Sequence, residues 1–192
     1  MIKFEDYKVD VPEGRIGDYE VKKFVVPAFA FQGGFRAVPK GEYTGLYRDS
    51  YLIMSDTPDE VRDHIEFIDE AKGNVFIGGL GIGMVLKALC QSEAVNHITV
   101  VEKSAEVIKL VEDHYLSQFP DKITIIEADL MEFEPNSSDY WDYVWFDIWD
   151  DIDMDNLKDI KLLSDRFSKH APWIDSWSRE LLKINCKLCF SN

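Results

Sequence analysis

The chain has 192 residues, of which 46% are hydrophobic and 13% aromatic, so it is long and apolar enough to bury a substantial core. Its formal net charge of -15 opposes contact with phosphate backbones and anionic lipids, which disfavours general nucleic-acid binding and membrane binding. The N-terminus MIKFEDYKVD lacks a basic stretch followed by an apolar one, and no segment is apolar for long enough to cross a bilayer, so we expect a cytoplasmic protein.

Residues 1–55 predict an N-terminal β region. Short β-rich pieces such as YEVKKFVVPAFAF and VPKGEYTGLYRDSYLIM are separated by turns that contain glycine and proline, a pattern typical of hairpins. The period changes at SDTPDEVRDHIEFIDEA, where a Ser or Asp cap, Pro58 in the first turn and the acids Asp59 and Glu60 predict a helix start. We therefore divide the chain into an N-terminal region, 1–55, and a second domain, 56–192.

From Gly73 onward, apolar strands alternate with helical patterns. Runs such as ITVV and ITII suit strands that are buried on both faces, as in a parallel sheet covered by helices. The sequence predicts strands at NVFIGG, HITVVEK, KITIIEAD and YWDYVWFDIW, and helices at MVLKALCQSE, SAEVIKLVEDHYLSQF, NLKDIKLLSDRFSKHA and PWIDSWSRELLKI, with a last strand ending in CKLCF. This order predicts an α/β fold with a doubly wound, Rossmann-like and mostly parallel sheet.

The first predicted strand of this domain runs into a glycine-rich turn, GGLGIG, before a helix begins. Gly79, Gly81 and Gly83 remove side chains from a turn whose following helix presents unpaired N–H groups. Either close packing of the helix on a strand or a ligand lying against the backbone would select glycine here. The turn alone does not separate these two explanations.

Each of the next three predicted strands ends near an acid. Glu102 follows Gly81 by 21 residues, a spacing at which an acid at a strand tip can accept hydrogen bonds from ribose hydroxyls. Asp129 ends the following strand, where a carboxylate can accept an adenine amine proton, and Asp147 ends the next. Because the carboxyl ends of parallel strands meet at one edge of a sheet, we predict a nucleoside site there. The alternative is that each is a surface acid of an acidic protein.

Four stretches, VFIGGLGIG, ITVVEKSAEVIKLV, ITIIEAD and DYVWFDIWDD, together resemble the class I S-adenosylmethionine-dependent methyltransferases, and within that superfamily the spermidine-synthase-like branch. The resemblance covers about residues 43–151. It implies S-adenosylmethionine (SAM) as the cofactor. The implied roles are contact with the methionine part of SAM by Gly79, Gly81 and Gly83, ribose binding by Glu102, adenine binding by Asp129, and a place at the reactive centre for Asp147.

The D-x-x-D of Asp147 and Asp150 resembles the paired acids with which aminopropyltransferases hold and deprotonate an attacking amine, and these enzymes use decarboxylated SAM. Two differences oppose that activity: the branch's glutamine before the Asp-Glu helix falls near Met54, and its glycine-loop aspartate is replaced around Gly81. The family's last two strands also have no counterpart after Asp151, so the resemblance implies a sheet truncated after its fifth strand. Acceptor contacts would then come from the N-terminal hairpins, from Trp173 and Trp177, or from a second subunit.

Three further residues are candidates for the reactive centre. Asp147 is the candidate base or positioning acid, because a base is needed when the nucleophile is a protonated amine or a hydroxyl. His64 is a candidate catalytic residue that closes the site, and the alternative for it is a histidine on a helix surface. Trp149 is placed to stack on adenine or to face a sulfonium, and the alternative for it is buried packing.

No metal site is predicted. The stretch DIDMDN from Asp151 has acids at positions one, three and five of a calcium loop, but position six is Asn156 and position twelve is Leu162. Cys186 and Cys189, at i and i+3 of a predicted strand, face opposite sides and would not share a ligand.

The sequence therefore favours a SAM-dependent, methyltransferase-like transferase that acts on a small acceptor, with a cationic acceptor suited to the negative charge of the chain. Two alternatives stay open: aminopropyl transfer from decarboxylated SAM, and a non-catalytic nucleoside-binding or interaction module. The aromatic residues and the truncated sheet edge are compatible with a homo-oligomer.

Overall fold

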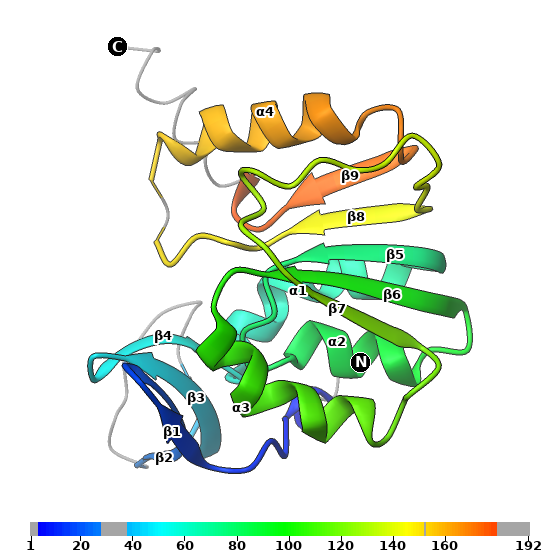
Figure 1. Ribbon diagram of the computed structural model, residues 1–192. Helices are drawn as coiled ribbons and strands as arrows, with labels where there is room; N and C mark the ends of the chain where they lie inside the picture. Colours follow the sequence, from blue (N-terminus) through cyan, green and yellow to red (C-terminus); the bar gives the residue numbers. More distant parts are fainter. Residues whose placement is uncertain (1–3, 28–37, 152, 180–192) are drawn as a thin grey trace.

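The computed structural model describes residues 4–27, 38–151 and 153–179, and Figure 1 shows two sheets. The N-terminal sheet is antiparallel and has the order β1-β2-β3-β4, which confirms the predicted hairpins. Its strands are β1 (Gly14–Ile16), β2 (Tyr19–Val26), β3 (Gly41–Arg48) and β4 (Tyr51–Ser55), and a short 3-10 helix, Phe4–Tyr7, precedes them.

The second sheet is parallel throughout and has the order β7-β6-β5-β8-β9. Its strands are β5 (Gly73–Gly78), β6 (Val95–Glu102), β7 (Ile123–Glu127), β8 (Tyr143–Phe146) and β9 (Trp173–Ser176). The first strand therefore lies in the middle and the order reverses between β5 and β8, as in a doubly wound sheet. The predicted Rossmann-like fold is confirmed, and ligands of such sheets bind at the carboxyl ends of the strands beside this reversal.

Both faces of the parallel sheet are covered, and its side chains alternate between two hydrophobic clusters. Val75 and Ile77 of β5 belong to one cluster, whereas Phe76 between them belongs to the other. On the first face lie α1 (Pro58–Glu70), α2 (Met84–Gln91) and α3 (Ala105–Leu116); on the second lies α4 (Asn156–Phe167). This period of two explains why the strands are apolar along their whole length.

The helix predicted at PWIDSWSRELLKI is wrong over its first part. Residues Trp173–Ser176 form β9, which pairs in parallel with β8 so that Tyr143 lies opposite Trp173 and Phe146 opposite Ser176. Pairing with an already buried strand outweighs the helical spacing of apolar residues in this stretch. The strand that pairs with β8 in the described parallel sheet is thus β9. That segment, with Cys186 and Cys189, lies outside the described residues.

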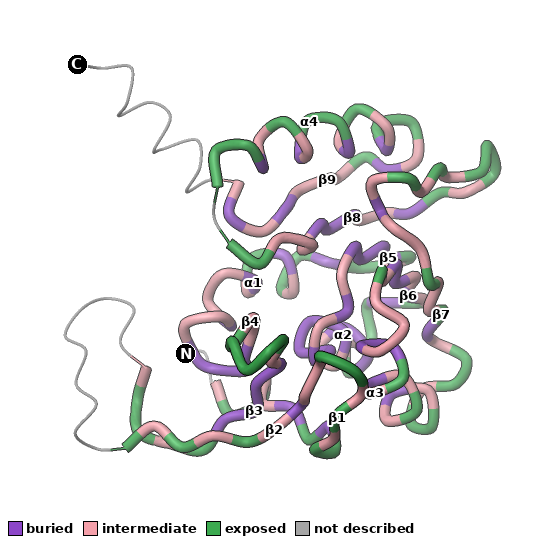
Figure 2. Tube along the Cα trace, turned by 60° about the vertical axis from the view of Figure 1, so that its left-hand side comes forward, coloured by how far each residue is buried: buried purple, intermediate pink, exposed green. Residues whose placement is uncertain are grey.

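The two sheets share a hydrophobic cluster. Val21 of β2 and Leu46 of β3 belong to the same cluster of buried residues as Ile77 of β5 and Met84 of α2. Figure 2 shows the buried positions gathered along the central strands and α2. No helix in the described ranges is both long and apolar enough to cross a membrane.

Asp56 joins three segments at the entrance to α1. Thr57, and not the predicted Ser or Asp, occupies the N-cap position of this helix. The buried Asp56 carboxylate instead accepts hydrogen bonds from the backbone N–H groups of Val9, at 2.9 Å, and Thr44, at 2.7 Å. Burial raises the pKa of this carboxyl, and the two N–H donors oppose that rise. The contacts connect the segment before β1 and strand β3 to the start of α1.

We expect Asp56→Ala to lower the free energy of unfolding by about 2 to 4 kcal/mol, because it leaves two buried N–H groups without an acceptor. Urea unfolding followed by circular dichroism measures the change. Asp10→Ala removes an exposed acid from the same N-terminal segment and should change stability by less than about 0.5 kcal/mol. Equal stabilities of Asp56→Ala and the unaltered protein would contradict this role.

Candidate functional site

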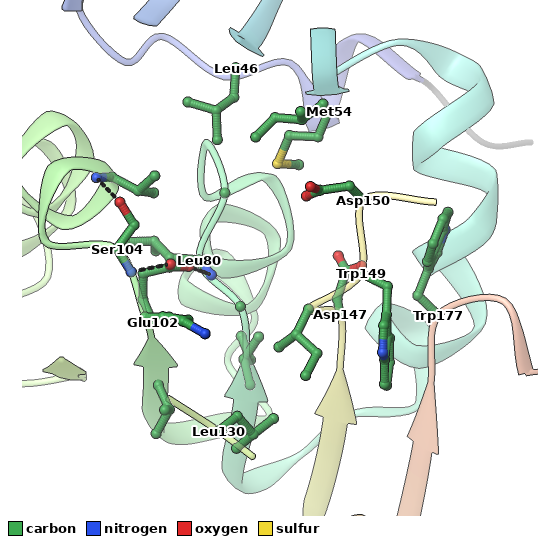
Figure 3. A pocket seen from close by; sticks show the side chains of 18 of the residues that line it. Leu46, Met54, Leu80, Glu102, Ser104, Leu130, Asp147, Trp149, Asp150 and Trp177 are labelled. Atoms are coloured by element: carbon green, nitrogen blue, oxygen red, sulfur yellow. Dashed lines mark hydrogen bonds between the residues drawn. The ribbon is translucent and has the colours of Figure 1, made fainter. Parts of the chain in front are cut away.

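A cavity of about 930 Å³ lies at the carboxyl edge of the parallel sheet, where the sequence predicts the nucleoside site. The turn after β5 and the ends of β6, β7 and β8 form its walls on one side. The N-terminal sheet contributes Leu46, Arg48 and Met54 on the other, and Figure 3 shows Leu46 and Met54 opposite Glu102 and Asp147. The cavity therefore needs both sheets, and its volume is in the range of small-molecule sites.

Glu102 connects two turns at the floor of the cavity. Its Oε2 accepts a hydrogen bond from the Leu80 N–H in the glycine turn, and its Oε1 accepts one from the Ser104 N–H at the start of α3, both at 2.8 Å (Figure 3). Ser104 caps α3 by accepting from the Val107 N–H at 3.2 Å, and it donates its hydroxyl proton to Glu106. A carboxylate offers about four acceptor positions, so Glu102 retains capacity toward the cavity.

Of the three glycines predicted to contact a cofactor, the structure places Gly79 and Gly81 in the cavity wall but not Gly83. A Cβ at Gly79 would collide with the Asp147 carbonyl oxygen, and its φ of 99° is unfavourable for other residues. Gly83 has a φ of 73° and faces the Tyr115 ring behind the wall, so packing accounts for it. The Sδ of Met54 lies where a Gly81 side chain would begin. Close packing is thus sufficient to explain all three glycines.

Four N–H groups of the glycine turn are used within the chain. The N–H of Gly79 donates to Val101 O at 2.8 Å and that of Gly83 to Leu80 O at 2.9 Å. The Ile82 N–H donates to Met54 Sδ at 3.3 Å, and the Leu80 N–H is held by Glu102. A phosphate at such a turn normally takes several of these N–H groups. These four N–H groups are therefore not available to a phosphate.

Asp129 lies at the far side of the cavity and has a cationic partner. Its Oδ2 accepts from Lys103 Nζ at 2.6 Å, and its Oδ1 accepts from the Met131 N–H at 2.9 Å. The hydrogen bond from Lys103 is the main cause that lowers the pKa of Asp129. Asp129 is thus a fixed carboxylate in the wall formed by the residues after β7.

Asp147 follows β8 and faces the cavity, with 24% of its side chain exposed. Burial, together with the negative charges of Glu60, Asp63 and Glu102, raises its pKa to about 8. The Nε2 of His64 lies 3.7 Å from Asp147 Oδ2, too far for a hydrogen bond. His64 is only 1% exposed, and burial lowers its pKa to about 4. Burial thus favours the uncharged form of both side chains.

His64 is in the second layer of the site and not on a helix surface. It does not line the cavity, and its Nδ1 has no hydrogen-bond partner among the described residues. The edge of its ring meets the Trp145 ring, with centroids 5.7 Å apart. The structure thus places His64 beside Asp147 but outside the cavity lining, so its catalytic role stays a prediction.

Asp150 and Trp149 lie in the cavity wall after β8. Asp150 pairs with Arg48 of β3, so an ion pair joins the two sheets across the cavity. Trp149 Nε1 donates to Asp159 Oδ2 at 3.3 Å, and the ring also packs against the hydrophobic cluster under α4. Figure 3 shows Trp149 beside Trp177. Of the two tryptophans proposed from the sequence for acceptor contacts, Trp177 lines the cavity and Trp173 does not.

The cavity is strongly acidic. Its described lining holds the basic side chains Arg48 and Lys103, and each is paired with an acid of the same lining. The acidic side chains in the lining are Glu60, Glu102, Glu106, Asp129, Asp147, Asp150, Asp151, Asp153 and Asp159. Arg48, Lys103 and Glu60 are cavity residues that were not predicted from the sequence. Glu60 was visible only as a first-turn acid of a helix, and Arg48 carried no motif at all.

Within residues 4–27, 38–151 and 153–179, no group of three or more His, Cys, Asp or Glu side chains is arranged to hold a metal ion. Two acids of the DIDMDN stretch have local partners. Asp153 accepts from the Asp155 N–H at 2.8 Å, and Asp155 itself pairs with Lys158 at the start of α4.

We expect Asp147→Asn to stabilise the ligand-free protein increasingly as pH rises from 5 to 8. Asp147 binds its proton more tightly in the folded chain than in the unfolded chain, whose pKa is about 3.9, so its contribution to stability falls with rising pH up to about 8. Asparagine does not ionise, so the stability of the variant does not fall in this way. Its Tm should exceed that of the unaltered protein by about 4 °C or more at pH 8. Differential scanning calorimetry across this range measures the difference.

Asp150→Asn is the matched control, because it removes an acid of the same loop whose carboxylate is paired with Arg48. Its Tm difference from the unaltered protein should not grow between pH 5 and 8. His64 titrates in all three proteins and therefore does not affect the comparison. A Tm difference for Asp147→Asn that is constant with pH would contradict the raised pKa.

No model of a protein family matches the sequence, and no curated protein does. Solved structures that resemble the chain include methyltransferases. Coclaurine N-methyltransferase bound to N-methylheliamine and S-adenosylhomocysteine (SAH) is 17% identical, with a TM-score of 0.45 over 58% of this chain and 30% of that one. A bacterial Hen1 methyltransferase domain is 18% identical, with a TM-score of 0.46 over 60% of this chain and 61% of that one.

A Pyrococcus horikoshii protein described as a candidate RNA methyltransferase is 17% identical, with a TM-score of 0.47 over 67% of this chain and 64% of that one. The chain thus spans between 30% and 64% of the length of these three structures. At these identities and TM-scores the similarity carries no argument about activity. The assignment of a Rossmann-like sheet rests on the strand order itself.

Proposed function

We propose that the chain is a SAM-dependent, methyltransferase-like transferase that acts on a small acceptor. The single observation that supports this most directly is the position of Glu102. Its carboxylate is fixed by two backbone N–H groups at the floor of a 930 Å³ cavity, beside the strand-order reversal of a doubly wound sheet. There it retains acceptor positions for the two hydroxyls of a ribose.

The chemistry of the lining fits a nucleoside that carries a cation and no phosphate. The glycine turn uses four of its N–H groups within the chain, and the acidic lining repels phosphates, so both oppose nucleotides and dinucleotides. Leu130, Met131 and Ile148 supply apolar surface near Asp129, suited to an adenine ring. The acidic lining favours a positively charged sulfonium. SAM combines an adenosine with a sulfonium and has no phosphate, so it matches this combination.

Each predicted residue then has a specific task. Glu102 holds the ribose, Asp129 accepts from the adenine amine when Lys103 moves aside, and Gly79 and Gly81 line the methionine part. Asp147 faces the reacting atoms, with His64 positioned behind it. When bound, SAM supplies a methyl group on a positively charged sulfur that leaves as a neutral thioether. The chain has to hold the acceptor in line, keep water out, and accept a proton from an amine or hydroxyl acceptor.

Acceptor contacts are expected at the end of the cavity opposite Asp129. Glu60, Asp150 and Trp177 lie there with Asp147, and the acids favour a cationic or neutral acceptor over an anionic one. Trp177 Nε1 donates to Asp63 Oδ2 at 3.3 Å, which fixes the indole against α1. An aromatic face next to carboxylates is a common environment for an amine.

Calorimetric titration of the purified protein with SAM and SAH tests the proposal. We expect micromolar binding of both. If neither compound binds, the chain is not a SAM-dependent transferase. Binding without turnover of any small amine or hydroxyl acceptor would favour the non-catalytic module.

We expect Glu102→Ala to weaken binding of SAH by about 1 to 3 kcal/mol, because the ribose hydroxyls lose their acceptor. Titration calorimetry measures the change in Kd, and circular dichroism checks that the fold is retained. Glu127→Ala is the matched control, because Glu127 pairs with Glu102 in the neighbouring strand but is exposed and outside the cavity. Equal losses of affinity in the two variants would remove the ribose role.

Aminopropyl transfer is a second candidate, and one observation favours it. The cavity lining holds Asp147 and Glu60, and its two described basic residues are paired with acids, Arg48 with Asp150 and Lys103 with Asp129. The α-carboxylate of SAM would meet these acids, whereas decarboxylated SAM carries only positive charge in its tail. In the described part of the lining, no basic side chain is left to pair with the α-carboxylate of SAM.

Competition between the two cofactors separates these activities. If aminopropyl transfer is the activity, decarboxylated SAM should bind at least about tenfold more tightly than SAM, a difference of about 1.4 kcal/mol. Tighter binding of SAM would exclude this candidate and retain methyl transfer. Methylthioadenosine, which lacks both the sulfonium and the tail charges, reports the contribution of the nucleoside alone.

A further inference from the structure

The acids of the cavity are not equivalent. The Glu102 carboxylate accepts two backbone N–H groups, Asp129 accepts from Lys103, and Asp150 is paired with Arg48. Among the described residues, the Asp147 carboxylate accepts no hydrogen bond, and the Nε2 of His64 lies 3.7 Å from its Oδ2. Asp147 thus differs from these three acids, because no partner among the described residues compensates its negative charge.

The groups around Asp147 explain why it holds a proton. Helix α1 turns Glu60, Asp63 and His64 toward it, and Glu102 lies at the end of β6. Three of these four neighbours are acids. The fourth, His64, is 1% exposed and has its pKa lowered to about 4 by burial, so it stays neutral and provides no positive charge.

The next ion pair does not supply the missing cation. Asp150 follows Asp147 in the same loop, and its carboxylate already holds the Arg48 guanidinium of β3. From the β5 side, Gly79 presents no side chain. The elements packed against Asp147 therefore offer it negative charge from α1 and β6, a neutral imidazole from α1, and a guanidinium that is paired elsewhere.

We propose that Asp147 exchanges its proton for the positive charge of the ligand. The free protein holds Asp147 as a neutral carboxylic acid, and a sulfonium placed against it binds with release of that proton to the solvent. The O–H bond of the carboxyl breaks, the proton goes to buffer, and the carboxylate that is left faces the sulfonium. This inference rests on the proposed function and adds a proton to its binding step.

The exchange closes a cycle during turnover. Transfer of a methyl group to a neutral amine gives a protonated, methylated amine and leaves a neutral thioether in the site. The ammonium product leaves with its proton, and the Asp147 carboxylate, now without a positive charge facing it, takes a proton from the solvent, which restores the carboxylic acid. The affinity of the site for the sulfonium form over the thioether form is thereby set by the protonation of Asp147.

SAM and SAH form a matched pair of probes, because they differ in one methyl group and the charge on sulfur. Titration calorimetry at pH 7 in buffers of different ionisation enthalpy gives the number of protons released by each. With a free-state pKa of about 8, Asp147 is about 90% protonated at this pH, so SAM should release close to one proton more than SAH. The affinity for SAM should rise by up to about tenfold per pH unit between pH 6 and 8, whereas that for SAH stays nearly constant.

Two variants identify the group. Asp147→Asn should bind both ligands and abolish the difference in proton release, whereas His64→Gln should retain it, since His64 is neutral throughout. Equal proton release for SAM and SAH by the unaltered protein, or a difference that persists in Asp147→Asn, would overturn the proton exchange while leaving SAM binding intact. Failure of both ligands to bind would instead overturn the proposed function itself, and the exchange with it.

Discussion

The cavity depends on the carboxylate of Glu102. One oxygen holds the N–H of Leu80 in the turn after β5, and the other holds the N–H of Ser104 where α3 begins. A single side chain at a strand end therefore fixes the relative positions of two connections that form the wall. Because both hydrogen bonds are to a charged acceptor, they are stronger than those between neutral groups. The geometry of the site is thus established before any ligand enters.

The same edge of the sheet shows how position decides what a carboxylate can do. Glu102 is held by N–H groups, Asp129 by an ammonium, and Asp150 by a guanidinium. Asp147 has the same side chain as Asp129 and Asp150, yet it lies among acids and beside a neutral imidazole. Its environment, and not its chemistry, makes it the group that responds to a positive charge.

Much of this arrangement was visible in the sequence. Apolar runs that end at Glu102, Asp129 and Asp147 predicted parallel strands whose tips meet, because strand direction and layer packing follow from local pattern. The strand Trp173–Ser176 was missed, since four residues are too few to show a period and its pairing partner β8 is distant in sequence. Arg48 and Met54 enter the site only through the packing of the N-terminal sheet.

The glycine turn is a feature whose cause could not be predicted from the sequence. Its composition suggested a ligand, but Gly79, Gly81 and Gly83 are each required by a neighbour within the chain: the Asp147 carbonyl, Met54 and the Tyr115 ring. The neighbour that requires a glycine at each position is distant in sequence, so only the tertiary structure identifies it. His64 is similar, because a helical pattern cannot tell that its ring is buried against Trp145 and Asp147.

The position of Met54 has a consequence for how such a protein can diversify. Its sulfur, from β4, accepts the Ile82 N–H and covers Gly81, so the last strand of one sheet and the first turn of the other form a single surface. A recombination event near residue 55 would preserve two recognisable sheets but would separate the halves of this surface. Exchange of N-terminal segments between related chains would therefore change ligand selectivity most through residues 46–54. The sheet that looks like an appendage is the part through which specificity could evolve while the parallel sheet stays constant.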